Sequence, residues 1–173
     1  AADMRRRLEE NRGPEIAFTG DQGYKLADVL DGKVTMDAFV AQLTDEDLIC
    51  LFRGEGMCSP KVTPGTASAF GGLTERLEYF GIPAACCADG PSGIRMDCGT
   101  KAFSLPNGTA IGCTFDEQLA EELYRMTGRE LRLNKIDTLL GPGMNIHRSP
   151  LNGRNFEYIS EDPLVTGKIA AAQ

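Results

Sequence analysis

Two short apolar runs, each closed abruptly by a glycine- and proline-containing turn, constrain the fold of this chain most strongly. Residues 82–88 run directly into the sequence DGP, and residues 136–140 run into GPG. Short runs of this kind are typical of buried strands in a parallel sheet. In parallel α/β architectures, the loops beyond the carboxyl ends of such strands carry the functional groups.

A helix is predicted between the two runs. Thr114 and Glu117 match the two positions of a capping box, which stabilises a helix N-terminus. Leu119, Leu123 and Met126 follow at helical spacing and mark one face of a helix that extends towards the second run. The order strand, helix, strand predicts an α/β protein built on a parallel sheet.

Residues 1–34 are predicted to form a linker or a connector from a preceding domain. A short charged helix is expected to end at Gly13, and residues 15–33 are interrupted by glycines, which favours an extended arm. Residues 35–173 are predicted to form one truncated folded domain.

The folded part is predicted to begin with two helices. Thr35 and Thr44 are suited to cap them, and acidic residues follow Thr44 in the first turn. The predicted buried side chains are Met36, Phe39, Val40 and Leu43 in the first helix and Leu48, Leu51 and Phe52 in the second. Residues 54–72 are rich in glycine and predict a long loop, and a last helix is predicted after Asp162.

Composition and charge exclude several classes of protein. The chain has 173 residues, of which 42% are hydrophobic and 25% charged, as is typical of a soluble globular domain. Its net charge of −7 disfavours nucleic acids and anionic membranes as partners. No stretch is long and apolar enough for a membrane span, and the N-terminus lacks the apolar core of a signal peptide, so a cytoplasmic location is expected.

The cysteines and the single histidine indicate no metal site. No two cysteine pairs show the CxxC spacing of a zinc site, and the adjacent Cys86 and Cys87 are predicted to be buried thiols. His147 would need metal-binding partners from distant parts of the chain. Asn107 opens the sequence Asn-Gly-Thr, which fits both a glycosylation acceptor and a turn, and we interpret it as a turn.

Two loops carry the side chains that could bind or act on a ligand. Asp89 follows the first predicted strand, and Arg154 lies in the polar loop after the second. A carboxylate that accepts hydroxyl protons, beside a planar guanidinium that donates, matches the edge of a sugar. Two structural alternatives stay open: Asp89 could cap its own turn, and Arg154 could pair with Glu157, Glu161 or Asp162.

The strings DGPSGIR at residues 89–95 and GRNFEYISEDP at residues 153–163 together resemble the motifs of glycoside hydrolase family 3. A looser resemblance extends from residue 36 to residue 173, with its pieces in the same order and spacing. Within the family, the two strings resemble the branch of β-glucosidases and β-xylosidases.

The resemblance implies that the chain forms about the first two βα units of a (β/α)8, TIM-type barrel, preceded by the helical and linker segment. It also implies that Asp89 and Arg154 line the subsite for the terminal glucosyl residue, with Arg95 as a further sugar-binding candidate. Residues 18–32 resemble the connector of family members in which a sandwich domain precedes the barrel.

The activity implied for the intact protein is retaining hydrolysis of non-reducing terminal β-D-glucosyl residues, without a metal or organic cofactor. Such a reaction needs a nucleophilic aspartate and an acid/base glutamate about 5–5.5 Å apart. Both are expected outside this chain, which therefore supplies no catalytic residue and is expected to be inactive alone. Its expected partners are a β-glucoside or oligosaccharide and the remainder of its own enzyme.

Three alternative functions differ from this one. A β-xylosidase of the same family would use the same motifs, and a non-catalytic carbohydrate-binding module would keep the sugar contacts without turnover. A nucleotide-binding α/β domain would use the glycines around Pro142, but proline has no N–H to offer a phosphate.

Overall fold

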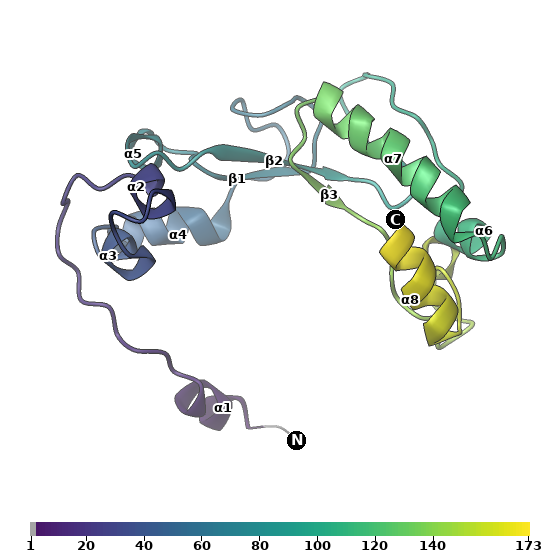
Figure 1. Cartoon of the computed structure of the whole chain (residues 1–173), viewed down its shortest axis with the longest axis horizontal. Coiled ribbons are helices and arrows are strands. Elements are labelled where there is room, and N and C mark those ends of the chain that lie inside the picture. The colour runs from purple at the N-terminus through teal and green to yellow at the C-terminus, as the bar shows by residue number, and fades with distance from the viewer. Residues whose placement is uncertain (1–2) are drawn as a thin grey trace.

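A three-stranded mixed sheet forms the centre of the computed structural model, which describes residues 3–173 (Figure 1). β1 (Ser68–Gly71) pairs antiparallel with β2 (Ala84–Asp89), and β2 pairs parallel with β3 (Thr138–Leu140). The α/β class and the parallel pairing of the two predicted strands are confirmed. Cys86 and Cys87 are buried in β2, as predicted.

β1 is a strand that the sequence did not predict, because it lies within the residues assigned to a loop. It contains only four residues, too few to show the alternation of a longer strand. Gly71, the last residue of β1, and Gly72, the next residue, lie closely against the chain before β2. A Cβ atom added at either glycine would lie closer than 3.0 Å to a backbone oxygen of Ile82 or Pro83. The antiparallel pair therefore depends on glycine at the point where its strands approach most closely.

The crossover helix α7 (Glu117–Leu133) begins later than the capping box predicts. Asp116, and not Thr114, is its N-cap, and the Asp116 carboxylate accepts a hydrogen bond from Leu119 N at 3.0 Å. Thr114 Oγ1 donates to Ile111 O at 2.6 Å, and Phe115 adopts a left-handed backbone with φ of 52°. Residues 113–116 therefore form a non-helical link between α7 and the short helix at Gly108–Gly112. The predicted cap is wrong by two residues.

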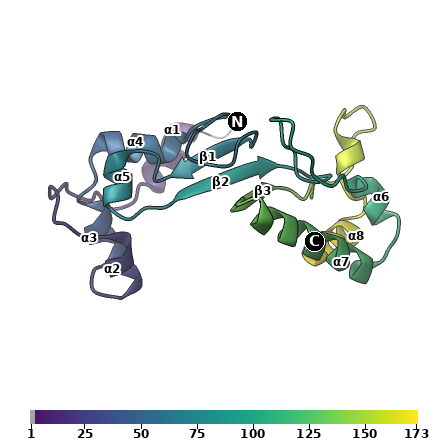
Figure 2. The ribbon, with the colours of Figure 1, turned by 90° about the horizontal axis from the view of Figure 1, so that it is seen from above.

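The buried face of α7 also differs from the prediction. Its buried residues are Ala120, Tyr124 and Thr127, whereas Leu119 and Met126 are 40% and 57% exposed. The chief neighbour of the helix is α8 (Pro163–Ala172), which lies with it at one end of the sheet (Figure 2), and Leu131 near its C-terminus packs against the buried Cys86 and Ile136. Leu123 is partly buried and packs against the same core as Ala120 and Tyr124, so the predicted face is confirmed at Leu123 and wrong at Leu119 and Met126.

Four short helices gather at one end of the sheet (Figure 1). Phe39, Leu43 and Phe80 form their core, and the rings of Phe39 and Phe80 meet edge to face with centroids 6.3 Å apart. Thr35 and Thr44 cap two of the helices, as predicted. Met36 and Phe52 were predicted to be buried but are 51% and 92% exposed. The helices are α2 (Leu26–Leu30), α3 (Met36–Val40), α4 (Asp45–Arg53) and α5 (Glu75–Tyr79).

The N-terminal arm leads away from this helical cluster to α1 (Met4–Glu10) (Figure 1). The predicted short charged helix is confirmed and all its residues are exposed, but it ends at Glu10 and not at Gly13. α2 lies within the segment predicted to be extended, and the partly buried Leu26 and Val29 pack against the core of the cluster. Within residues 3–173, no helix is both long and apolar enough to cross a membrane.

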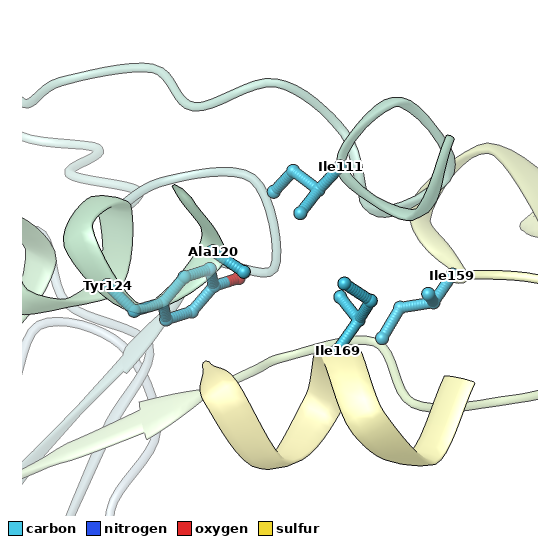
Figure 3. Packing of buried hydrophobic residues seen from close by; sticks show 5 residues of the cluster. All are labelled: Ile111, Ala120, Tyr124, Ile159 and Ile169. Atoms are coloured by element: carbon cyan, nitrogen blue, oxygen red, sulfur yellow. The ribbon is translucent and has the colours of Figure 1, made fainter. Parts of the chain in front are cut away.

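A second core joins α7 to the carboxyl end of the parallel strands. Its buried members come from α6 (Gly108–Gly112), α7, α8 and the loop before α8 (Figure 3). Asn107 caps α6 by accepting a hydrogen bond from Ala110 N at 2.9 Å, so the predicted turn is the start of a helix. The helix predicted after Asp162 is α8, and the Asp162 side chain caps its N-terminus. The five buried residues are Ile111, Ala120, Tyr124, Ile159 and Ile169.

Candidate functional site

The two motif-bearing loops leave the sheet at the same edge. Asp89, the last residue of β2, stands in register with Leu140, the last residue of β3. Gly90 N donates a hydrogen bond to Leu140 O at 3.3 Å, so the strands stay paired up to the point where their loops begin. Parallel strands place the loops beyond their carboxyl ends side by side, and here these are residues 90–95 and 141–163.

Asp89 is half-buried, and its carboxylate is free of protein hydrogen bonds within residues 3–173. Its backbone carbonyl accepts from Arg95 N at 2.8 Å, which closes the turn of the first motif. Gly90 is required in this turn because an added Cβ would lie closer than 3.0 Å to Gly93 O. The turn is thus closed by backbone contacts, and both carboxylate oxygens of Asp89 remain able to accept from a ligand.

Arg154 precedes a 3₁₀ turn, η1 (Asn155–Glu157), and its side chain is 68% exposed. Its Nε donates to the carboxylate of Glu157, and the two groups form an ion pair. The hydrogen bond to Glu157 and the charge of that carboxylate raise the pKa of Arg154, with smaller contributions from Tyr158 and Asp89. Arg154 therefore carries its positive charge throughout the physiological pH range.

Arg95 lies at the end of the same turn as Asp89 but is engaged elsewhere. Its Nε donates to Asp97 Oδ1 at 3.1 Å, and its side chain is 67% exposed. An ion pair this exposed is weak and contributes at most about 1 kcal/mol. Arg95 is therefore near the candidate site and held only loosely by its neighbour.

The turn that carries Arg154 is anchored by residues that the sequence analysis missed. Thr109 Oγ1 lies 2.9 Å from Asn155 O and 2.8 Å from Tyr158 O, and His147 Nε2 lies 3.1 Å from Tyr158 O. We call Gly108, Thr109, Gly143 and His147 the turn anchor. A Cβ at either glycine would lie closer than 3.0 Å to Glu157 O. Glycine in an Asn-Gly turn and in a GPG turn was the only signal for these contacts in the sequence.

His147 has a structural position in this anchor. Besides Tyr158 O, its Nε2 lies 3.4 Å from Thr109 Oγ1. Residues 3–173 contain no group of three or more histidine, cysteine or carboxylate side chains that could hold a metal ion. The contacts of His147 are instead those of a residue that holds neighbouring segments together.

The sequence and the structure are both similar to known β-glucosidases. The chain is 67% identical to a β-glucosidase of Ruminococcus albus over 92% of its own length and 17% of the relative's length. Its structure matches a β-glucosidase of Paenibacillus barengoltzii with a TM-score of 0.92 and 59% identity, over 99% of this chain and 18% of that one. It also matches a GH3 β-glucosidase of Bifidobacterium adolescentis with a TM-score of 0.55 and 32% identity, over 66% and 16% of the two chains. The chain belongs to glycoside hydrolase family 3.

This glycoside hydrolase family 3 segment spans about a sixth of the length of the proteins it matches. No family model matches its sequence. The polypeptide that contains this segment together with the rest of such an enzyme is called the full-length enzyme below. Asp89 and Arg154 both lie within this segment.

Gly108→Ala in the full-length enzyme is expected to destabilise this part of the family 3 fold by about 1–3 kcal/mol, because the added methyl group meets the backbone of Glu157. The measurement is the melting temperature, which should fall. Gly128→Ala is the matched control, since it lies in α7 with no atom within 4 Å of the added Cβ. That change should leave the protein unaltered or stabilise it by up to about 1 kcal/mol. Equal melting temperatures for the two variants would contradict the anchoring role of Gly108.

Proposed function

We propose that this chain is the part of a retaining β-glucosidase that holds the non-reducing terminal β-D-glucosyl residue of the substrate. One observation carries the proposal: the uncommitted carboxylate of Asp89 and the exposed guanidinium of Arg154 lie beyond adjacent parallel strands, in a chain 67% identical to a β-glucosidase. Activity, substrate and site residues are all part of this proposal.

The chemistry of the two side chains is complementary to a sugar edge. An ionised carboxylate accepts protons from hydroxyl groups, and a guanidinium donates from fixed, coplanar N–H groups. The Nε of Arg154 is used by Glu157, which leaves the terminal N–H groups for the ligand. Adjacent sugar hydroxyls both donate and accept, so Asp89 and Arg154 together satisfy both properties. Arg95 is assigned a supporting role in the same subsite.

Bond cleavage is assigned to residues outside this chain. A retaining glycosidase uses one carboxylate as nucleophile, which forms a covalent glycosyl-enzyme, and a second carboxyl group that protonates the leaving oxygen and then activates water. This sequence of steps has no role for a metal or an organic cofactor. Asp89 and Arg154 would position the ring and strengthen their hydrogen bonds as it distorts towards the transition state.

The same proposal extends to the architecture of the enzyme. Residues 35–173 would form about the first two βα units of a (β/α)8 barrel, and residues 1–34 would connect them to a preceding domain. The parallel pair β2 and β3, linked by α7, supports the barrel assignment. The partners of the segment are then the substrate and the rest of its own enzyme.

The test of the proposed activity is the hydrolysis of 4-nitrophenyl β-D-glucoside by the full-length enzyme, with the anomer first released followed by proton NMR. We expect β-D-glucose to appear first, because retention requires two inversions. The β-D-xyloside should be the poorer substrate by kcat/KM. Absence of hydrolysis would contradict the enzyme assignment, α-glucose as first product would contradict retention, and a preferred xyloside would make the protein a β-xylosidase.

A further inference from the structure

The ion pair between Arg154 and Glu157 has one exposed and one buried member. The Arg154 side chain is 68% exposed, whereas that of Glu157 is only 8% exposed. Glu157 holds Arg154 by its Nε, which is the inner edge of the guanidinium. The terminal nitrogens of Arg154 have no hydrogen bond to protein groups within residues 3–173. The buried carboxylate of Glu157 therefore holds the Nε of Arg154, while the two terminal nitrogens of the guanidinium stay free.

Glu157 is itself held on several sides. Its backbone N donates to Arg154 O at 3.2 Å within the 3₁₀ turn. Its carbonyl packs directly against Gly108 and Gly143 of the turn anchor. Thr109 and His147 contact the carbonyl of the next residue, Tyr158. These contacts fix the backbone of Glu157, and the burial of its side chain, which is only 8% exposed, restricts the position of the carboxylate that pairs with Arg154.

We infer that Glu157 is a positioning residue for sugar binding, which orders the guanidinium of Arg154 before the sugar arrives. The inference rests on the proposed function. An exposed arginine side chain samples many rotamers, and ordering it at the moment of binding weakens affinity. The pair with Glu157 orders it in the free enzyme and directs its terminal N–H groups outward. Glu157 is too buried to serve as a main sugar contact, so it acts through Arg154.

Glu157→Met in the full-length enzyme removes the carboxylate but keeps the length of a buried side chain. Loss of one member of an ion pair is most damaging where the remaining charge is buried, and here the remaining Arg154 is 68% exposed and can be solvated. We expect kcat/KM for 4-nitrophenyl β-D-glucoside to fall about tenfold and the inhibition constant of glucose to rise, because Arg154 loses its tether. In the Arg154→Ala background, the same change should alter kcat/KM less than about twofold, as coupled residues are non-additive.

A matched control and a milder variant complete the experiment. Glu121→Met breaks an ion pair with Arg125 on α7 whose side chains are 59% and 61% exposed, and it should leave kcat/KM unchanged. Glu157→Gln keeps an oxygen that can accept from Arg154, so it should show a smaller loss that again disappears in Arg154→Ala. This second variant decides the result if Glu157→Met does not fold.

Failure of the positioning role and failure of the sugar site give different results. If Arg154→Ala is impaired while the Glu157 variants keep normal kcat/KM, or lower it equally with and without Arg154, the positioning role is overturned and the sugar site stands. Loss of melting temperature with unchanged specific activity of the folded Glu157 variants would overturn it too, in favour of a purely structural pair. Normal kcat/KM in Arg154→Ala would overturn both the sugar site and the role of Glu157.

Discussion

Asp89→Ala in the full-length enzyme is expected to lower kcat/KM for a β-glucoside about tenfold to ten-thousandfold, with a melting temperature close to that of the unaltered enzyme. Hydrogen bonds to charged groups contribute roughly 1.5–3 kcal/mol each, and the change removes one or two of them from the bound sugar. The carboxylate has no protein partner within residues 3–173, so the fold does not depend on it. Steady-state kinetics and thermal unfolding measure the two effects separately.

Asp137→Ala provides the contrasting control. The Asp137 carboxylate accepts a hydrogen bond from Cys86 N at 2.7 Å, near the opposite end of the same parallel pair. Its loss should lower the melting temperature and leave the specific activity of the folded enzyme unchanged. Arg154→Lys should resemble Asp89→Ala, because an ammonium group keeps the charge but loses the planar fork of N–H donors. Near-normal kinetics in a well-folded Asp89→Ala enzyme would refute the sugar-binding assignment.

The isolated 173-residue chain is expected to show no hydrolysis of 4-nitrophenyl β-D-glucoside above that of a mock preparation. Asp89 and Arg154 supply binding and orientation, but cleavage of the glycosidic bond needs a nucleophile and a proton donor. The measurement compares release of 4-nitrophenolate by equal molar amounts of the isolated chain and the full-length enzyme. Turnover that scales with the concentration of the isolated chain, and that Asp89→Ala abolishes, would place catalytic groups within these residues.

The elements that the sequence predicted well are those with a strong local signal. Thr35 and Thr44 are helix caps in the structure as in the prediction, because capping depends on residues within one turn, and the last helix begins after Asp162 as predicted. The strands on either side of α7 were recognisable from apolar runs closed by glycine and proline. β1 had no such signal. Its four residues are stabilised by their pairing with β2, and this pairing leaves no pattern within the strand itself.

Burial was less predictable than helix position. Phe52 and Met126 lie in helices and have large apolar side chains, yet both are more than half exposed within this segment. Ala120 and Thr127 are buried instead, because the neighbours of α7 lie on that side. A periodic pattern gives the spacing of a face, whereas the packing partner decides which face is covered.

The candidate site, too, was predicted only in part from the sequence. The sequence located Asp89, Arg95 and Arg154 by motif and offered Glu157 as one of three partners for Arg154. The structure selects Glu157, three residues away in the 3₁₀ turn. The contacts of Thr109 with residues 155–158 join segments more than forty residues apart, and no local pattern announces them. Such long-range anchoring is visible only once the chain is folded.

The antiparallel pairing of β1 with β2 affects the order in which a growing chain can build its sheet. Residues 72–83 separate these strands, so their pairing closes a short loop at a small cost in chain entropy. β3 begins about fifty residues after β2 ends, and synthesis of that stretch takes several seconds at about 5–20 residues per second. During translation the antiparallel ribbon can therefore form first. The edge at which the loops of Asp89 and Arg154 meet can form only later, because it requires β3, which is synthesised after α7.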